Sequence, residues 1–187
     1  MEILFVIVAV FIVLPLTFLI VQHNGLVMLK NHIADAWANI DTELKRRHDL
    51  IPNLVAAVKG YAKHEKEVLA QVVELRQQCL STKSFSEKRD GIEAQLGGAL
   101  SRMLAVVESH PDLKADQNFL QLQRELTNTE DRIQAARRFY NGNVRDYRNK
   151  CQSFPSNIVA AFFGFNSQDF FSATEIERQN PDIEFTS

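Results

Sequence analysis

The most chemically suggestive stretch of this 187-residue chain is LKRRHDLIPNLV, at positions 44–55. Its consecutive cations Lys45, Arg46 and Arg47 could bind anionic lipid headgroups or an acidic protein surface. Consecutive residues of a helix point in several directions, and acidic residues stand nearby at positions 41, 43 and 49. We therefore expect a solvated helix face here, with lipid or protein contact as the alternative.

A second candidate is Glu65, which follows His64. This pair opens the zinc pattern His-Glu-x-x-His, but the position of the second histidine holds Val68. Glu65 falls on an apolar helical stripe, where a carboxylate needs a partner or a proton. Arg137 and Arg138 lie near the stripe of another helix. We predict a buried ion pair that fixes helix packing, with proton transfer as the alternative.

Positions 127–141, TNTEDRIQAARRFYN, are dense in polar groups for a bundle helix. Such groups form networks between helices, which specify register more often than they catalyse. The predicted buried network contains Glu65, Glu130, Arg137, Tyr140 and Asn141. The sequence offers no nucleophile–base–orienter pattern, phosphate loop or metal constellation. We therefore predict no enzymatic activity, no cofactor, no metal and no small-molecule substrate.

Charge and cysteine content limit the possible partners. A formal net charge of −2 does not suggest a nucleic-acid-binding protein. Cys79 and Cys151 lie outside any zinc-type spacing. We expect both to be small apolar residues on helix faces, with a disulfide as the alternative.

The N-terminal run at positions 3–21, ILFVIVAVFIVLPLTFLIV, has no charged residue. Its 19 residues extend over roughly 28 Å as a helix, close to the ~30 Å hydrocarbon core of a bilayer. A cleaved signal peptide would have a basic start and a small-residue cleavage site, whereas this run follows Glu2 and has no Ala-x-Ala after it. We predict a retained single-pass anchor. Lys30 and the later cations give a slight preference for a cytoplasmic body.

The rest of the chain has helical periodicity. Apolar residues recur in steps of three and four along four series, and each series marks one stripe of a helix. The four series run from Leu26 to Leu44, from Ile51 to Cys79, from Ile92 to Val107 and from Phe119 to Cys151. The sequence predicts an all-α protein, an N-terminal transmembrane helix followed by an antiparallel four-helix bundle.

Prolines and polar loops mark the expected boundaries. Pro52 either starts a new helix capped by Asp49 or lies in a near-continuous helix with a local bend. The apolar phase survives from Leu44 to Ile51, which favours the second. Ser84 and Glu87 have capping-box spacing and predict the start of the third helix. Expected parts are an anchor at 1–22, a bundle at 23–171 and a flexible acidic tail at 172–187.

The run from Ile158 to Phe171 is rich in phenylalanine and too short to span a bilayer. Apolar surface of that size is rarely left exposed, so we expect it to close the bundle or to dock a partner or lipid. Its candidate contact residues are Phe162, Phe163, Phe165, Phe170 and Phe171.

Two blocks of the chain resemble the LemA family: WANIDTELKRRHDLIPNLVAAVKGYAKHE at 37–65 and ELTNTEDRIQAARRFYNGNVRDYRNKCQSFPSNIVAAFFGF at 125–165. A small departure is Arg148 before Asn149, where many relatives have Tyr-Asn directly. The resemblance implies a bacterial protein with an N-terminal anchor, an antiparallel helical bundle and no enzymatic activity. Some relatives begin with a lipoprotein signal, and others organise membrane compartments. The side of the membrane occupied by the body therefore stays open.

These observations predict a scaffold or adaptor at the bacterial inner membrane. It would bind another protein or assemble as a homo-oligomer. One alternative is an accessory subunit of a membrane protease or other envelope enzyme. The other is a module that binds anionic lipid through the cations at positions 45–47.

Overall fold

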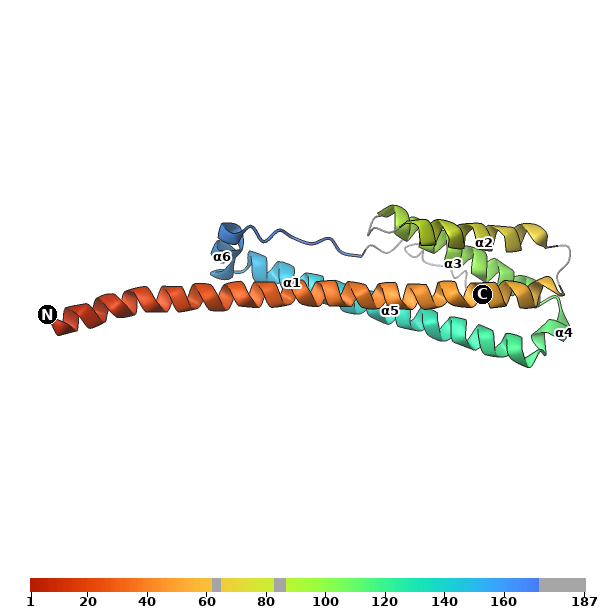
Figure 1. The fold of residues 1–187 in the computed structure, drawn as a ribbon, viewed down its shortest axis with the longest axis horizontal. Helices are drawn as coiled ribbons and strands as arrows, with labels where there is room; N and C mark the ends of the chain where they lie inside the picture. The colour runs from red at the N-terminus through yellow and green to blue at the C-terminus, as the bar shows by residue number, and fades with distance from the viewer. Residues whose placement is uncertain (62–64, 83–86, 172–187) are drawn as a thin grey trace, which may run out of the picture. The chain divides into compact units, whose positions relative to one another are not determined.

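The computed structural model describes residues 1–61, 65–82 and 87–171, apart from the side chains of Val6, Glu87 and Lys88. The described residues form helices joined by short connections, with no strand among them (Figure 1). The helices are α1 (Glu2–Lys59), α2 (Lys66–Ser81), α3 (Glu87–Val107), α4 (Pro111–Lys114), α5 (Gln117–Gln152) and α6 (Ser156–Phe163). The predicted all-α class, with a long apolar N-terminal helix and a helical bundle, is confirmed.

The structure divides into two compact units. Unit 1 contains Met1–Asp41 and Gln134–Phe171, and unit 2 contains the described residues of Thr42–Ile133.

Helix α1 has 58 residues and runs without interruption through both Pro15 and Pro52. At Pro52 the helix loses the N–H that would bond the carbonyl of His48, four residues earlier. Arg76 of α2 replaces that donor, because its Nε donates to the His48 oxygen at 2.7 Å. Pro52 therefore lies inside a continuous helix, and α2 supplies the hydrogen bond that the proline removes.

The chain turns instead at Gly60 and Tyr61, where the Tyr61 N–H donates to the carbonyl of Val58. Glycine is a poor helix former, which favours termination there. The apolar series predicted from Ile51 to Cys79 thus spans the end of α1 and most of α2. Glu65 stands exposed before the first residue of α2, so its predicted burial is wrong: the turn breaks the phase on which that prediction depended.

Unit 2 is built around one apolar core shared by four long helical segments. The last turns of α1 provide Ile51, Leu54 and Val58, and α2 provides Leu69, Val72, Leu75 and Cys79. The remaining core residues come from α3, α4 and the start of α5: Ile92, Leu96, Ala99, Leu100, Met103, Val107, Leu113, Phe119 and Leu126. Each helix buries the stripe that its periodicity predicts, and short connections favour antiparallel neighbours. Ser84, the predicted cap of α3, lies outside the described residues, as does the predicted acidic tail at 172–187.

In unit 1, α1 up to Asp41 packs with α5 from Gln134 onward, α6 and the segment 164–171. The buried apolar side chains are Leu26, Ile33, Ala36, Ile40, Tyr140, Val144, Tyr147, Val159, Ala160 and Phe171. Helix α6 ends at Gly164, which has a left-handed φ of 71°. The N–H of Phe165 then bonds the carbonyl of Ala160 at 2.9 Å, which closes the helix end and lets the chain reverse.

The apolar run at positions 3–21 forms the first turns of α1, and the large side chains described in it are exposed. Among the described helices, α1 alone is long and apolar enough to cross a membrane.

Candidate functional site

A cluster of charges in unit 2 links α1, α3 and α5. Arg47 of α1 is 3% exposed, and its guanidinium donates to Glu93 of α3 at 2.5 Å and to Glu130 of α5 at 2.8 Å. His48 Nε2 lies 3.1 Å from Oε1 and 3.2 Å from Oε2 of Glu93. The cluster therefore joins three helices: Arg47 and Glu93 are buried, and the Glu130 side chain is 44% exposed.

This position corrects the expectation of a solvated basic face at Arg47. The residue lies three positions after Leu44 and four before Ile51, so it shares the buried stripe of α1. His48 shares that stripe for the same reason. Lys45 and Arg46 are exposed, and they alone of the three predicted contact cations face solvent.

The charge states in this cluster follow from its neighbours. Burial by itself would raise the pKa of Glu93, but the hydrogen bond from His48 and the positive charges of Arg47 and His48 outweigh it and lower the pKa. Cys79 shows the opposite effect. Burial, assisted by the negative charge of Glu93, raises the pKa of its thiol to about 12. At neutral pH the cluster thus contains a carboxylate and a protonated thiol.

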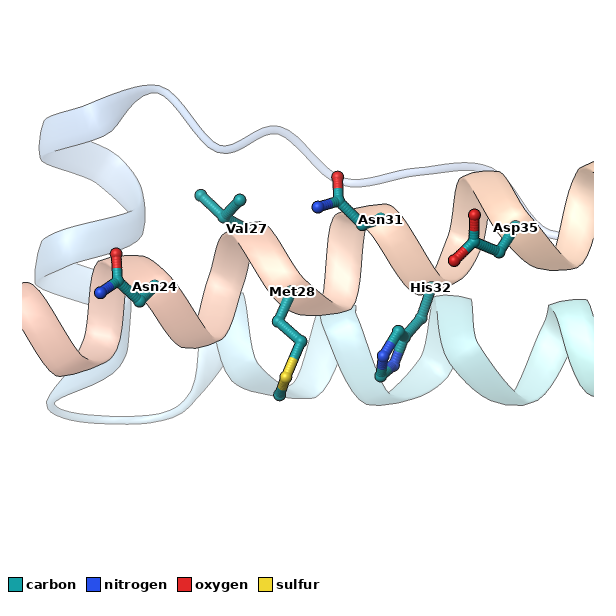
Figure 2. A pocket seen from close by; sticks show the side chains of 6 residues that line it. All are labelled: Asn24, Val27, Met28, Asn31, His32 and Asp35. Atoms are coloured by element: carbon teal, nitrogen blue, oxygen red, sulfur yellow. The ribbon is translucent and has the colours of Figure 1, made fainter.

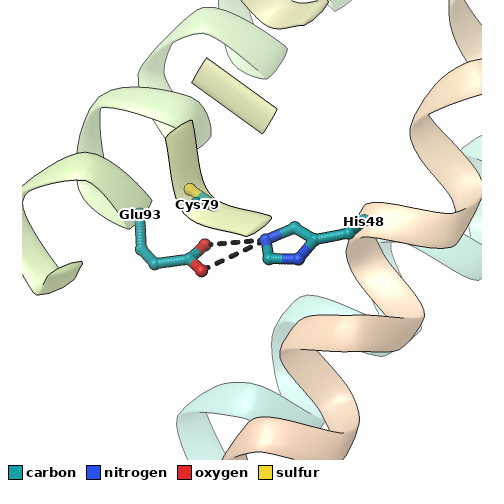
Figure 3. A group of neighbouring side chains, drawn as sticks. All are labelled: His48, Cys79 and Glu93. Carbon is teal, nitrogen blue, oxygen red and sulfur yellow. Dashed lines mark hydrogen bonds and ion pairs between the residues drawn. The ribbon is translucent and has the colours of Figure 1, made fainter. Parts of the chain in front are cut away.

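The same cluster contains a nitrogen, a sulfur and a carboxylate that could act as metal ligands. The ligand atoms of His48, Cys79 and Glu93 lie within 4.8 Å of one another and come from three helices (Figure 3). Such donors suit zinc when the thiol is deprotonated. A zinc ion would have to displace the thiol proton and share Glu93 with the guanidinium of Arg47. The contacts at Glu93 therefore form an ion-pair cluster, and a metal ion could bind there only if those contacts were broken.

A second polar arrangement lies in unit 1, where α5 holds the segment that follows α6. Asn141 makes two hydrogen bonds with the backbone of Phe171: its Nδ2 donates to the carbonyl at 3.0 Å, and its Oδ1 accepts from the N–H at 2.8 Å. The hydroxyl of Tyr140 donates to the carbonyl of Asp169 at 3.1 Å. The side-chain amide of Asn141 thus makes both backbone hydrogen bonds that a neighbouring strand would make, and it fixes the end of this segment.

The ring of Phe171 is enclosed from two sides and is 6% exposed. Arg137 lies over one face, with its guanidinium carbon 4.5 Å from the ring centroid. Trp37 of α1 stacks at a centroid distance of 6.1 Å and also contacts Tyr140 edge-on at 5.9 Å. We call Trp37, Arg137, Tyr140 and Asn141 the segment clamp.

The predicted polar network is therefore distributed over separate places. Arg137, Tyr140 and Asn141 belong to the clamp in unit 1. Glu130 pairs with Arg47 in unit 2, and Glu65 is exposed. We predict one network because all its members but Glu65 lie on one helix. Their partners, however, come from different parts of the chain, so the predicted network is not a single one.

Sequence reasoning missed His48, Glu93, Trp37 and Arg76 as members of these arrangements. A signal existed for Glu93, which lies three residues before Leu96 and seven before Leu100, on the buried stripe of α3. The clamp had no such signal. Its partner, 169–171, is a non-helical segment about thirty residues away from Tyr140 and Asn141.

The predicted contact phenylalanines have different surroundings. Phe171 is buried, Phe165 is half-buried, and Phe170 lies under the guanidinium of Arg148 at 4.9 Å. Phe162 and Phe163 are exposed at the end of α6.

The two thiols are free in the structure, so the disulfide alternative is wrong. Cys151 is half-buried beside Tyr147. Burial of Tyr147, together with its hydrogen bond to Cys151, raises the pKa of the tyrosine to about 12.

A shallow surface hollow lies along α1 in unit 1. Its lining side chains project from successive turns of this one helix: Asn24, Val27, Met28, Asn31, His32 and Asp35 (Figure 2). Because a single helix supplies all of them, the hollow does not surround a small molecule as an enzyme pocket does.

Comparison with known proteins identifies the family. The model of the LemA family matches residues 36–185, which include the segment clamp and the charge cluster. The chain belongs to the LemA family. Protein LemA of Metamycoplasma hominis is 28% identical over 161 residues, covering 86% of this chain and 74% of the relative.

Magnetosome proteins are also similar to this LemA family member. MamQ 2 of Paramagnetospirillum magneticum is 23% identical over 178 residues, covering 82% of this chain and 65% of the relative. MamQ of Magnetospirillum gryphiswaldense is 21% identical over 181 residues, covering 83% and 66% respectively. This chain spans slightly less than two thirds of those relatives' length.

Family membership and the apolar N-terminal helix together identify a membrane-associated helical protein. The resemblance of positions 37–65 and 125–165 is thereby confirmed. The first block contains Trp37, Arg47, His48 and Pro52, and the second contains Glu130 and the rest of the clamp. The two blocks thus supply most of these contact residues, while Arg76 and Glu93 lie between them.

Proposed function

We propose that this LemA family member is a membrane-anchored scaffold or adaptor of the bacterial inner membrane, which acts by binding another protein or by assembling with itself. The observation that carries the proposal is the use of its buried polar side chains. Arg47 binds Glu93 and Glu130 across helices, and Asn141 binds the backbone at Phe171. These groups hold helices together, which is what a scaffold requires.

The outer surface supplies apolar side chains for a partner. On the described body these include Val73 and Leu80 of α2 and Phe139 of α5, which are exposed. Scattered apolar side chains are normal on protein surfaces, so they indicate positions for probing rather than an interface by themselves. The magnetosome relatives are named for a cell structure and not for a reaction, which agrees with a scaffold.

Lys30, close after the apolar run that ends at Val21, gives slight support to a body on the cytoplasmic side through the positive-inside tendency. Protease accessibility of the full chain in intact spheroplasts tests this part. Protection of the body agrees with a cytoplasmic location, and cleavage places it outside.

Site-specific photocrosslinking in native membranes tests the scaffold role. A photoreactive residue replaces Phe139 or Val73 in the full chain, with exposed Gln121 on α5 as the polar control position. We expect one dominant crosslinked product from at least one of the two apolar positions, either with a second copy or with a single protein. Absence of any discrete product at all three positions contradicts the proposal.

The same experiment separates the alternatives. A product that contains a membrane protease identifies the chain as its accessory subunit. Crosslinks confined to lipid, with binding that falls when Lys45 and Arg46 are replaced, indicate the lipid-binding module instead.

A further inference from the structure

Helix α6 has two very different faces. Ser156, Val159 and Ala160 are buried against unit 1. Ile158 and Phe162 lie four residues apart on the outer face and are 60% and 80% exposed. Phe163 beside them is about half exposed. Because the largest apolar side chains of this eight-residue helix are exposed, we expect lipid or another protein surface to cover them.

The position of α6 within unit 1 indicates which of the two covers these side chains. The ring of His23 contacts Phe163 at a centroid distance of 4.7 Å and Phe165 at 5.5 Å. His23 is the second residue after Val21, where the apolar run of α1 ends. Helix α6 therefore lies beside the turn of α1 at which the chain would leave a bilayer, as the ribbon also shows (Figure 1).

The charges near α6 agree with this position. No charged residue occurs from Gln152 to Gln168, so immersing this stretch does not desolvate an ion. Lys150, just before it, has its Nζ next to Gly25, at 3.6 Å from where a Cβ would lie on that glycine. An ammonium at this height suits the phosphate groups of lipids, and aromatic rings suit the adjoining interface.

We propose that α6 is an interfacial membrane segment whose outer face, Ile158, Phe162 and Phe163, enters the boundary between headgroups and acyl chains of the bilayer that α1 crosses. Because α1 anchors the chain in the bilayer and α6 packs beside α1, α6 stays near this boundary, so a short apolar face suffices for insertion. The inference rests on the membrane anchor of the proposed function and adds a second, monotopic contact to it.

Depth-dependent quenching by brominated lipids tests the inference on the full chain in phosphatidylcholine vesicles. The single Trp37 is replaced by phenylalanine, which keeps an aromatic ring against Phe171, and a tryptophan then replaces Phe162. Two matched variants carry the tryptophan at Phe139, an exposed position of α5 in the same unit, or at Phe11, in the middle of the apolar run.

We expect bromines placed shallowly in the acyl chains to quench the Phe162→Trp variant at least twofold, and its emission to shift to the blue. The Phe139→Trp variant stays unquenched, and the Phe11→Trp variant is quenched best by deep bromines. Because Phe162 is largely exposed, its replacement leaves folding intact, which thermal melting of each variant verifies.

Three results overturn the inference. If Phe11→Trp is quenched while Phe162→Trp emits like the Phe139 control, the anchor holds but α6 lies in water. If Phe162→Trp is blue-shifted without lipid quenching, a protein surface covers α6 instead. If Phe11→Trp is not quenched either, the anchor itself fails, and with it the membrane part of the proposed function.

Discussion

Arg76 of α2 donates a 2.7 Å hydrogen bond to the carbonyl of His48, the group that Pro52 leaves without its helical donor. A proline inside a helix normally costs about 3 kcal/mol, partly through this lost bond. Here a second helix supplies the bond, so a local defect in α1 becomes a contact between α1 and α2. The LKRRHDLIPNLV segment is thus a helix–helix joint, with two of its four consecutive basic residues inside the core.

The first prediction concerns this joint. Replacing Arg76 with methionine leaves the buried His48 carbonyl unsatisfied and lowers the free energy of unfolding by about 1–3 kcal/mol. In a Pro52→Ala background the helix regains its own N–H donor, so the same Arg76→Met change costs less. Urea unfolding of the four proteins of this double-mutant cycle measures the difference. Equal costs in both backgrounds would show that Arg76 acts independently of the proline.

The second prediction concerns the buried charges. Glu93→Gln removes a charge that both Arg47 and His48 contact, and breaking such a pair costs about 3–5 kcal/mol. Glu130→Gln is the matched control. It removes the other partner of Arg47, but its carboxylate side chain is 44% exposed, so the change costs less. Chemical unfolding at neutral pH ranks the two, and an equal or reversed ranking would contradict the assigned role of Glu93.

The third prediction is the pH dependence of stability. The pKa of Glu93 is lowered in the folded protein, so its contribution to stability is fully present above the unfolded-state pKa, which lies near the ordinary value of 4.5. As the pH falls through the lower folded-state pKa, the carboxylate is protonated and the contribution is lost. The Glu93→Gln variant should therefore lose less stability than the native chain between pH 6 and about pH 3. Parallel acid-unfolding profiles for the two proteins would contradict the lowered pKa.

The fourth prediction concerns zinc. Because the Cys79 thiol holds its proton up to about pH 12 and Arg47 already binds Glu93, we expect micromolar zinc to leave the melting temperature unchanged at neutral pH. Differential scanning calorimetry with and without zinc measures this, and Cys79→Ala serves as the control. A zinc-dependent rise in melting temperature that disappears in Cys79→Ala would instead identify the cluster as a metal site.

The fifth prediction concerns the segment clamp. Asn141→Ala removes both hydrogen bonds to the Phe171 backbone, each worth about 1 kcal/mol, so local opening of residues 169–171 should become at least about tenfold more frequent. Hydrogen exchange at these amides measures the opening. Asn149→Ala, at an exposed site on the same helix, should leave exchange unchanged. Equal exchange in both variants would mean that Asn141 does not hold the segment.

Periodicity made most of the fold predictable. The series from Leu26 to Leu44 and from Ile92 to Val107 contain residues that the structure buries, because a helix must hide its apolar stripe. The same rule applied to Arg47, three residues after Leu44, would have predicted its burial. We instead interpreted the consecutive cations as a surface group, and that interpretation was wrong for Arg47.

Two features lay beyond periodicity for physical reasons. The exposure of Glu65 depends on where α1 ends, and the turn at Gly60 interrupts a phase that looks continuous in the sequence. The clamp on Phe171 depends on a non-helical segment that returns to α5, and no repeating pattern encodes such a contact. Only the folded arrangement brings Trp37 to the same ring.

We propose that this membrane-anchored chain works by holding proteins together. The mass of the protein complex that contains the chain in the membrane tests this most directly. Native mass spectrometry of the full chain, extracted from its own membranes in polymer nanodiscs, measures the protein mass of each particle. A scaffold or adaptor predicts a particle heavier than one 21.3 kDa chain, with either whole-number copies of the chain or a second protein at fixed ratio. Particles that contain a single 21.3 kDa chain and no other protein would contradict the account.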